Sequence, residues 1–469
     1  MLILGGNQLA GGFAVDNSCR FNDGSSDHLT RNPASAGNRK TFTFSAWCKF
    51  SNTTTSLTLF HAEIWSTTPW GLIQRQSDNT IRVRFYDGAN DYNLITNRLF
   101  RDVSAWYHVV VAVDTTQATS SNRIKLYING TQETSFATAT YPTQNYDTAF
   151  NNTVEHQIGE EAGLGNYFDG YMAEVCLIDG TALDPTSFGE FDEDTGIWKP
   201  ISVSGLTFGT NGFYLPFQNS AALGQDDSGN GNNWTVNNLT SIDQTTDTPT
   251  NNYATLNPNM AYPSTSITIS DGNLDVIRTA GTAWENILST FAPSSGKWYT
   301  EVKVTGVGSN GVNIGFANID VSNRQNLTNA FGEDANSAGI YSASGAIFYN
   351  SGTTFATVGS YTAGDIIQLA MDIDNGYLYW GKNGTWLNSS DPESGATGTG
   401  GLALSNLTLG GSYAMGVSLR NSGDVTWNFG NPAFTISSGN SDGNGYGNFE
   451  YSVPSGYYAL NTKNLAEFG

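Results

Sequence analysis

The stretch SAWYHVVVAVD, residues 104–114, decides the fold of the first half of this chain. Apolar residues occupy both of its faces, and a strand that is apolar on both faces is typical of the centre of a sheet. We therefore predict a central strand over Trp106–Val113. In IKLYING, residues 124–130, apolar residues alternate as in a strand with one buried face. Asn129-Gly130 then predicts a hairpin turn.

A long strand is also predicted for TFTFSAWCKF, residues 41–50, because every second residue is apolar. One face of this strand should lie against the core, and the other face is mixed. Helix is expected only as short turns, at two places. Asp184 suits the N-cap of one turn and Pro185 its first position. Trp284–Phe291 is the other candidate.

The composition is that of an all-β protein. The 469 residues include 53 glycines, 12% are aromatic and only 13% are charged, which suits many short strands joined by tight turns. A chain of this length can form two or three domains, each with its own core. The net charge of −22 repels phosphate backbones and anionic lipid surfaces. Nucleic acid is therefore excluded as a partner, and membrane insertion is not expected.

The first residues and the cysteines indicate a protein made in a reducing compartment. The opening MLILGGNQLAGG has an apolar run of only three residues and no basic flank, so no signal peptide or anchor is predicted. The three cysteines, Cys19, Cys48 and Cys176, are odd in number and lie in strand-like runs. We interpret them as buried thiols.

The second half has its own strand and turn signals. They are SSGKWYTEV at 294–302, GDIIQLAMDIDNGYLYWGKNG at 364–384 and VTWNFGNPAF at 425–434. Within residues 364–384 two turn signals, Asp374-Asn375-Gly376 and Asn383-Gly384, separate three alternating runs. This pattern predicts a meander of three strands.

These motifs resemble two known families of recognition domains. SAWYHVVVAVD, IKLYING and YFDGYMAEVCLID (167–179) resemble a concanavalin A-like, laminin-G-type sandwich, and the motifs of the second half resemble a SPRY domain. The resemblance implies two antiparallel β-sandwiches. The expected organisation is an N-terminal arm at 1–17, a laminin-G-like sandwich at 18–188, a connector at 189–262 and a SPRY-like sandwich at 263–469.

The connector is not expected to be a flexible linker. Its stretch GFYLPFQNSAALGQDDSGNGNNWTVNN, residues 212–238, resembles the opening of laminin-G-like domains, although the other strands of such a domain are missing. A flexible linker would expose its aromatic side chains, Trp234 among them. We expect the connector to add strands to the first sandwich or to brace the junction.

Catalytic motifs are not found in the sequence. Glucanases of the concanavalin-like scaffold carry Glu-x-Asp-x-x-Glu on one strand, and this string is missing. Glu174 and Asp179, five residues apart, should point to opposite faces of their strand. The four histidines lie in neither a nucleophile elbow nor a His-Glu-x-x-His pair, and His108 is predicted to be a hydrogen-bonded core residue. We therefore expect a protein that is not an enzyme.

Structural calcium is the one cofactor considered, because laminin-G-like sandwiches often bind it. The resemblance implies that Asp23 and Asp27 in NDGSSD lie beside Asp169 in the closing strand. Carboxylate oxygens are suitable calcium ligands. The alternative, which the sequence favours, is that these aspartates only form turns.

Aromatic residues in loops are the candidates for ligand contact, because a sugar ring stacks on an indole or phenol. In the first module these are Trp65, Trp70 and Tyr92, and in the second Trp386 and Tyr446. The alternative is that each ring closes the end of a sandwich.

The order of motifs along the whole chain resembles virion proteins of tailed bacteriophages. The motifs are 168–200 in the first module, TNGFYLPF, DSGNGNNWTVNN and TPTNNYATLNP in the connector, and GYYALNT near the end. This resemblance implies a structural protein of the virion, assembled in the cytoplasm of the bacterial host. It would be a tail-fibre or receptor-binding component that recognises a host surface glycan or protein, contacts other virion proteins and forms a homo-oligomer. A capsid-decorating protein and a polysaccharide-degrading enzyme are the alternatives, and the missing carboxylate string disfavours the enzyme.

Overall fold

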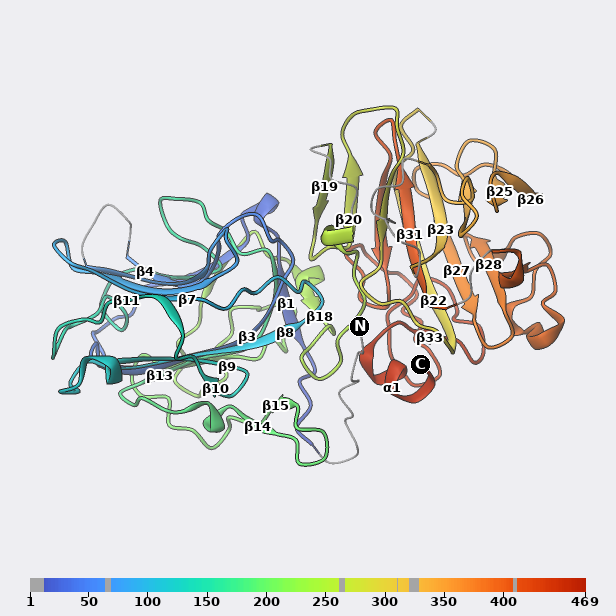
Figure 1. Cartoon of the computed structure of the whole chain (residues 1–469). Helices are drawn as coiled ribbons and strands as arrows, with labels where there is room; N and C mark the ends of the chain where they lie inside the picture. Colours follow the sequence, from blue (N-terminus) through green and yellow to red (C-terminus); the bar gives the residue numbers. More distant parts are fainter. Residues whose placement is uncertain (1–11, 64–68, 261–265, 310, 320–328, 408–410) are drawn as a thin grey trace. The chain divides into compact units, whose positions relative to one another are not determined.

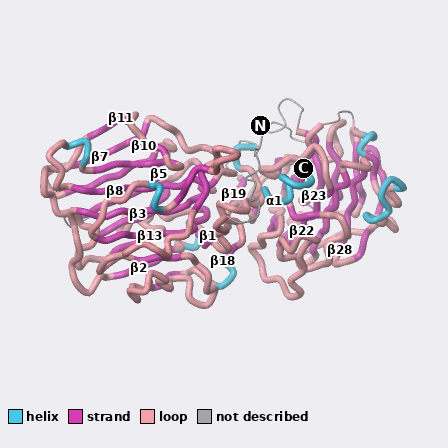
Figure 2. The backbone as a smooth tube through the Cα atoms, turned by 90° about the horizontal axis from the view of Figure 1, so that it is seen from below, coloured by secondary structure: helices cyan, strands magenta, loops and turns pink. Residues whose placement is uncertain are grey.

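The computed structural model describes residues 12–63, 69–260, 266–309, 311–319, 329–407 and 411–469. These residues form an almost entirely β structure, as Figure 2 shows, in which α1 (Thr462–Phe468) is the one α-helix of the described part. None of the described helices has the length and apolar character needed to cross a membrane. The fold confirms the all-β prediction of antiparallel sandwiches.

Two compact units divide the chain, one ending at Asn252 and the other beginning at Tyr253. This boundary precedes the one expected near Tyr262. The reason is that Tyr253, Ala254 and Leu256 are buried in the cores of the second unit. The backbone N–H of Ala254 donates to the carbonyl of Leu460 at 2.9 Å.

The first unit consists of two large sheets and one small one (Figure 1). Its first sheet runs in the order β10 (Thr131–Gln132), β9 (Ile124–Ile128), β8 (Trp106–Asp114), β3 (Thr41–Phe50), β13 (Gly170–Asp179), β1 (Ser18–Phe21) and β18 (Gln244–Thr245), and β16 (Phe213–Leu215) also pairs with β13. Its second sheet runs in the order β11 (Phe136–Ala139), β7 (Asp91–Thr96), β6 (Ile81–Tyr86), β5 (Trp70–Arg75), β4 (Leu57–Ala62), β12 (His156–Ile158), β2 (His28–Arg31) and β17 (Thr235–Asn237). The short strands β14 (Gly189–Phe191) and β15 (Trp198–Pro200) form a separate hairpin. The main core lies between the two large sheets.

Residues Trp106–Asp114 form the central strand that their apolar pattern predicts. β8 pairs with β3 on one side and with β9 on the other, so it is a central strand. β9 turns into β10 at Asn129 and Gly130, whose φ angles are 49° and 76°. Because φ is positive at both residues, this is the hairpin turn that the dipeptide predicts. Pro185–Ser187 is also a short helical turn with Asp184 as its N-cap, as expected.

The outer face of β3 is more buried than its alternation predicts. The face expected to be mixed carries Trp47, which packs against Val15, Ala173 and Trp198 in a small apolar cluster. Trp198 comes from the connector, so a later segment of the chain covers this face. Lys49 on the same strand is also buried, in an ion pair of 2.8 Å with Asp247. The three cysteines are buried free thiols, as predicted.

Besides the β14–β15 hairpin, the connector adds three strands to the two large sheets of the first unit. β16 pairs with β13, β17 with β2, and β18 with β1. A flexible linker would leave the side chain of Trp234 exposed. Instead, this side chain is 5% exposed and belongs to the main core. Residues 189–252 therefore complete the first sandwich.

The second unit has two sheets with a separate core between them. One sheet runs in the order β19 (Ile267–Ser270), β20 (Asp275–Arg278), β32 (Asp424–Asn428), β22 (Lys297–Gly306), β27 (Ile366–Asp372), β28 (Tyr377–Lys382) and β29 (Thr385–Trp386), and β30 (Leu402–Ala403) and β33 (Tyr458–Ala459) pair with β28 and β22. The other sheet runs in the order β21 (Glu285–Leu288), β31 (Tyr413–Leu419), β23 (Val312–Asn318), β24 (Ser337–Tyr341), β25 (Ala346–Tyr349) and β26 (Thr353–Thr357).

The predicted meander is present as β27, β28 and β29, which pair in sequence. The helical turn considered for Trp284–Phe291 is wrong, because Glu285–Leu288 is strand β21 and pairs with β31. Pairing with a distant strand overrides a weak local preference here. The helix α1 was not expected; it begins after Asn461, whose side chain caps it.

Candidate functional site

The aromatic candidates of the first unit are buried. Trp70 is 2% exposed, and the guanidinium of Arg84 lies 4.6 Å from the centre of its ring. Tyr92 is 7% exposed, and its hydroxyl donates to Asp87 at 3.1 Å. Neither ring presents a face on which a sugar could stack, so both fit the alternative that they close the sandwich. Trp65 lies outside the described residues.

One of the three proposed calcium ligands, Asp27, accepts hydrogen bonds within its own turn. Asp27 is 3% exposed, and its carboxylate accepts hydrogen bonds from the Asn22 N–H at 2.9 Å and the Ser25 hydroxyl at 2.8 Å. The side chain of Asp169 is also buried. For Asp23, partial burial raises the pKa of the carboxyl group. In the described ranges no three His, Cys, Asp or Glu side chains form a group that could hold a metal ion. The contacts of Asp27 are those of a turn-forming aspartate, and calcium stays a prediction.

His108 and Ser45 form the pair that comes nearest to a nucleophile with its base. His108 Nε2 lies 2.8 Å from the Ser45 hydroxyl, and the indole N–H of Trp198 donates to Nδ1 at 2.9 Å. Nδ1 is therefore the acceptor and Nε2 carries the proton, which is the wrong tautomer for a general base acting on Ser45. Both residues are buried, and burial lowers the pKa of His108 to about 3. His108 is a hydrogen-bonded core residue, as predicted.

Glu174 and Asp179 do not act on a common site. Glu174 lies at a bulge of β13 with φ of 51°, and its carboxylate accepts a hydrogen bond of 2.7 Å from the Tyr214 hydroxyl. Burial raises the pKa of Glu174 to about 7. Asp179 instead accepts from the backbone N–H groups of Asn38 and Asn211, at 2.7 and 2.9 Å. Glu174 therefore bonds to a side chain of β16, whereas Asp179 fixes two loop segments through their backbones.

The two aromatic candidates of the second unit are half-buried. The ring of Tyr446 is covered by Lys463, whose ammonium lies 5.4 Å from the ring centre. Trp386, on β29, packs edge to face with Tyr299, and their ring centres are 6.3 Å apart. Trp386 lines a pocket to which Tyr446 does not contribute.

This pocket of the second unit, which we call the Trp386 pocket, has a volume of about 330 Å³. That volume is at the lower end of the range for small-ligand sites. Three segments form it: the β27–β29 meander, the turn after it, and a segment near the C-terminus. The lining residues are Gln368, Gly384, Trp386, Asp391, Pro392, Glu393, Tyr451, Ser452, Val453 and Pro454.

Buried hydrogen bonds fix the C-terminal wall of the Trp386 pocket. Glu301 is 0% exposed, and its carboxylate accepts from the backbone N–H groups of Glu450 and Tyr451, both at 2.8 Å. The Tyr299 hydroxyl donates to the same carboxylate at 2.9 Å. The side chain of Glu301, on β22, therefore holds the backbone of Glu450 and Tyr451 in place by directed hydrogen bonds.

The other two walls are joined to this one. The backbone N–H of Ser455 donates to Glu393 at 2.8 Å, which links the C-terminal segment to the turn at 391–393. Gln368 accepts from the N–H of Gly384 at 2.7 Å. Gly384 has φ of 81°, and a Cβ there would lie 2.8 Å from the ring of Tyr451. A glycine is therefore needed both for the turn and for the ring to lie over it.

The sequence indicated Trp386 but not its partners in the pocket. Glu393 and Tyr451 are far apart in the chain, and only the fold brings them to one cavity. A partial signal exists in Asp391-Pro392, an N-cap followed by proline, which marks a turn next to the predicted meander.

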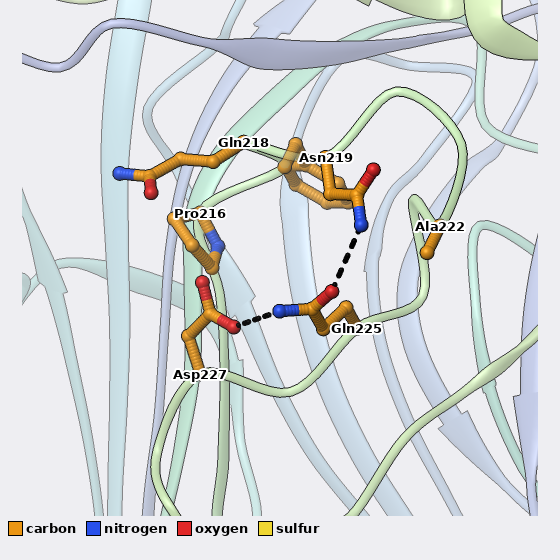
Figure 3. A pocket seen from close by; sticks show the side chains of 7 residues that line it. Pro216, Gln218, Asn219, Ala222, Gln225 and Asp227 are labelled. Carbon is orange, nitrogen blue, oxygen red and sulfur yellow. Dashed lines mark hydrogen bonds between the residues drawn. The ribbon is translucent and has the colours of Figure 1, made fainter.

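A smaller pocket of about 170 Å³ lies on the connector of the first unit (Figure 3). Three of its polar side chains bond to one another: Asn219 donates to Gln225 at 3.0 Å, and Gln225 donates to Asp227 at 2.8 Å. These groups are already paired, and the pocket has half the volume of the other. The Trp386 pocket is therefore the stronger candidate.

Comparison with known families supports the two module types. Residues 23–186 match the concanavalin A-like lectin/glucanases superfamily in its laminin-G form, and residues 297–431 match the SPRY domain. Among curated proteins no sequence matches the chain. The protein thus carries an N-terminal concanavalin A-like, laminin-G-like module and a C-terminal SPRY domain.

Solved structures of a SPRY domain, a pentraxin and laminin-G domains are similar to this chain, over 36% to 90% of its length. The SPRY domain of human HERC1 is 17% identical, covers 37% of this chain and 96% of its own, and has a TM-score of 0.27. A heptameric SAP-like pentraxin from Limulus polyphemus is 15% identical over 36% of this chain and 78% of its own, with a TM-score of 0.28. Domains LG4-5 of the mouse laminin alpha1 chain are 10% identical over 90% of both chains, with a TM-score of 0.31.

Proposed function

We propose that this chain, a concanavalin A-like module joined to a SPRY domain, is a non-enzymatic recognition protein on the surface of a bacteriophage particle. Its role there would be that of a tail-fibre or receptor-binding component, which binds a glycan or a protein on the host surface. The observation that carries the recognition role is the Trp386 pocket, a cavity of about 330 Å³ with directed bonds in its walls and an aromatic lining.

The two module types are compatible with binding. The first matched family takes in lectins as well as glucanases, so the choice between binding and catalysis must be argued from the site itself. The Ser45–His108 pair has the wrong tautomer for catalysis, and Glu174 and Asp179 bond to different segments of the chain. The bacteriophage context is supported by the resemblance of the motif order to virion proteins.

Adsorption of particles to host cells tests the role of the pocket. Trp386→Ala should reduce adsorption, because it removes the largest ring of the lining. Tyr446→Ala is the matched control, since Tyr446 is also half-buried in the second unit but lies outside the pocket. The melting temperatures of both variants show whether the unit remains folded. Normal adsorption of folded Trp386→Ala particles would contradict the proposal.

The same experiment separates host attachment from capsid decoration. A decoration protein would leave adsorption normal when the pocket is altered, and particles without the protein would lose stability. The number of copies per particle gives a second measure, because decoration requires many more copies than a tail fibre.

A further inference from the structure

We propose that the Trp386 pocket binds the cationic end of a lysine or arginine side chain presented by a protein partner. This inference rests on the proposed function and names the ligand chemistry of its site. The pocket combines two exposed carboxylates, two aromatic rings and apolar lining residues, and no basic residue lines it.

The carboxylates of the pocket are not neutralised by the chain itself. Asp391 uses one oxygen to accept from the N–H of Glu393 at 2.9 Å, and Glu393 uses one to accept from the N–H of Ser455 at 2.8 Å. Among the described residues, the second oxygen of each makes no hydrogen bond, and neither carboxylate has an ion-pair partner. Each backbone bond fixes one oxygen in place, so the remaining oxygen is held in position to accept from a cation.

The aromatic lining suits the same ligand. Trp386 and Tyr451 are both half-buried in the wall, so part of each ring is accessible. An ammonium or guanidinium group within about 6 Å of such a ring is attracted by its negative face, most strongly for tryptophan. The lining residues Pro392, Val453 and Pro454 are apolar and can contact the methylene stem of a long basic side chain.

The electrostatic environment around the pocket is negative. The pKa of Tyr451 is raised, mostly by burial and further by the negative charges of Glu450, Glu301 and Asp365. The pKa of Tyr457, which donates to the Pro392 carbonyl at 3.0 Å, is raised by burial and by carboxylates that include Asp391 and Glu393. Lys297 lies 5.7 Å from the ring centre of Tyr457, but it is paired with Asp372 at 2.9 Å. The same field disfavours an anionic ligand and favours a cation.

Peptide titration of the full chain tests this inference. The probes are three peptides with capped ends, Ala-Lys-Ala, Ala-Arg-Ala and Ala-norleucine-Ala, measured by calorimetry at low salt. We expect the two basic peptides to bind at least about tenfold more tightly than the norleucine peptide, which has a similar stem without the charge. Binding should weaken as salt is added, because the carboxylates are exposed.

Charge-removing variants identify the site. Asp391→Asn combined with Glu393→Gln keeps the oxygens that accept the two backbone bonds and should reduce binding of the basic peptides about tenfold or more. Glu193→Gln is the matched control: it removes the same charge from an exposed residue of the first unit and should leave binding unchanged. Equal binding of the norleucine peptide, or unchanged binding by the double variant, would overturn the inference.

A further arm distinguishes this inference from the proposed function. Glucosamine and neutral monosaccharides are titrated in parallel, and binding of these sugars without binding of the basic peptides would overturn the cationic side chain as ligand. If host adsorption depends on Trp386 but not on Asp391 and Glu393, the proposed function stands and the inference fails. If adsorption depends on neither, the proposed function fails as well.

Discussion

Trp70 shows how a residue that appears suited to binding can be buried instead. Its indole is 2% exposed and contacts both the Arg84 guanidinium and the ring of Tyr86, whose centre is 5.5 Å away. The amino-acid sequence around a tryptophan next to a loop does not show whether its ring is exposed to solvent or buried. The register of β5 with β6 puts this ring on the same face as Arg84 and Tyr86, opposite to the face of Ile73 and Val83 that lies in the main core, so the indole is buried without belonging to that core.

We predict that Trp70→Ala destabilises the first unit strongly. Truncating a buried aromatic side chain costs about 3–5 kcal/mol, because the cavity is only partly refilled. Chemical unfolding of the purified chain measures this loss. Trp386→Ala, at a half-buried position, should cost clearly less. A small loss for Trp70→Ala would mean that the indole does not pack as described.

Glu174 should make the first unit less stable as pH rises. Burial is the main cause that raises its folded pKa to about 7, while Asp16 adds to the shift and the Tyr214 hydrogen bond opposes it. A carboxyl whose folded pKa is above its unfolded value of about 4.3 binds its proton more tightly when folded. The stability that protonated Glu174 contributes to the folded unit is therefore fully present below the unfolded pKa. It is lost as pH rises through the folded pKa of about 7.

The variant Glu174→Gln should remove this pH dependence. We expect it to gain stability relative to the original chain between pH 5 and pH 8, by up to about 3 kcal/mol, since each unit of pKa shift corresponds to about 1.4 kcal/mol. Urea unfolding at the two pH values measures the difference. Glu193→Gln, at an exposed site, is the control and should leave the pH profile unchanged. Parallel profiles for Glu174→Gln and the original chain would contradict the prediction.

At the scale of elements, long-range pairing and buried polar groups place the segments that lack strong local signals. β21 is a strand because β31 pairs with it, although its local sequence permits a turn of helix. The C-terminal wall of the pocket has no regular structure at 450–454, yet Glu301 on β22 fixes it through two backbone bonds. A buried carboxylate thus replaces strand pairing as the support of this wall.

Glu301→Gln should loosen that wall. The amide nitrogen would face a backbone N–H that needs an acceptor, and a buried unsatisfied donor costs about 1–3 kcal/mol. We expect faster hydrogen exchange at the amides of Glu450 and Tyr451, and weaker binding at the Trp386 pocket. Exchange at the amides of β8 in the first unit serves as the internal reference. Unchanged exchange at both wall amides would show that Glu301 does not support the wall.

At the scale of the whole molecule, the chain consists of two units with separate cores. Each unit is long enough to bury its own apolar residues, and each recruits residues from outside the span of its family match. The first recruits the connector, and the second recruits the stretch from Tyr253 to Leu256.

We predict that residues 253–469 fold when expressed alone. The fragment contains Tyr253, Ala254 and Leu256, which are 1%, 0% and 0% exposed. A fragment of residues 263–469, which begins at the boundary that the sequence suggested, lacks these three side chains and should melt at a clearly lower temperature. Circular dichroism melts of the two fragments provide the comparison. Equal melting temperatures would place the boundary later than the structure does.

The class of fold, the two module types and many of the strands and turns could be predicted from the amino-acid sequence. These features are encoded locally: alternation over a few residues predicts a strand such as β9, and Asn129-Gly130 favours positive φ wherever it occurs. The burial of His108 and of the cysteines followed from the apolar strands around them.

Which surfaces remain free, and where a pocket forms, depend on how distant segments of the chain pack together. The outer face of β3 is covered because Trp198 packs on it from about 150 residues later in the chain. The Trp386 pocket exists because Glu301 and Glu393 bond to backbone N–H groups near the C-terminus. Such contacts depend on packing between distant segments, and no local pattern of residues encodes them.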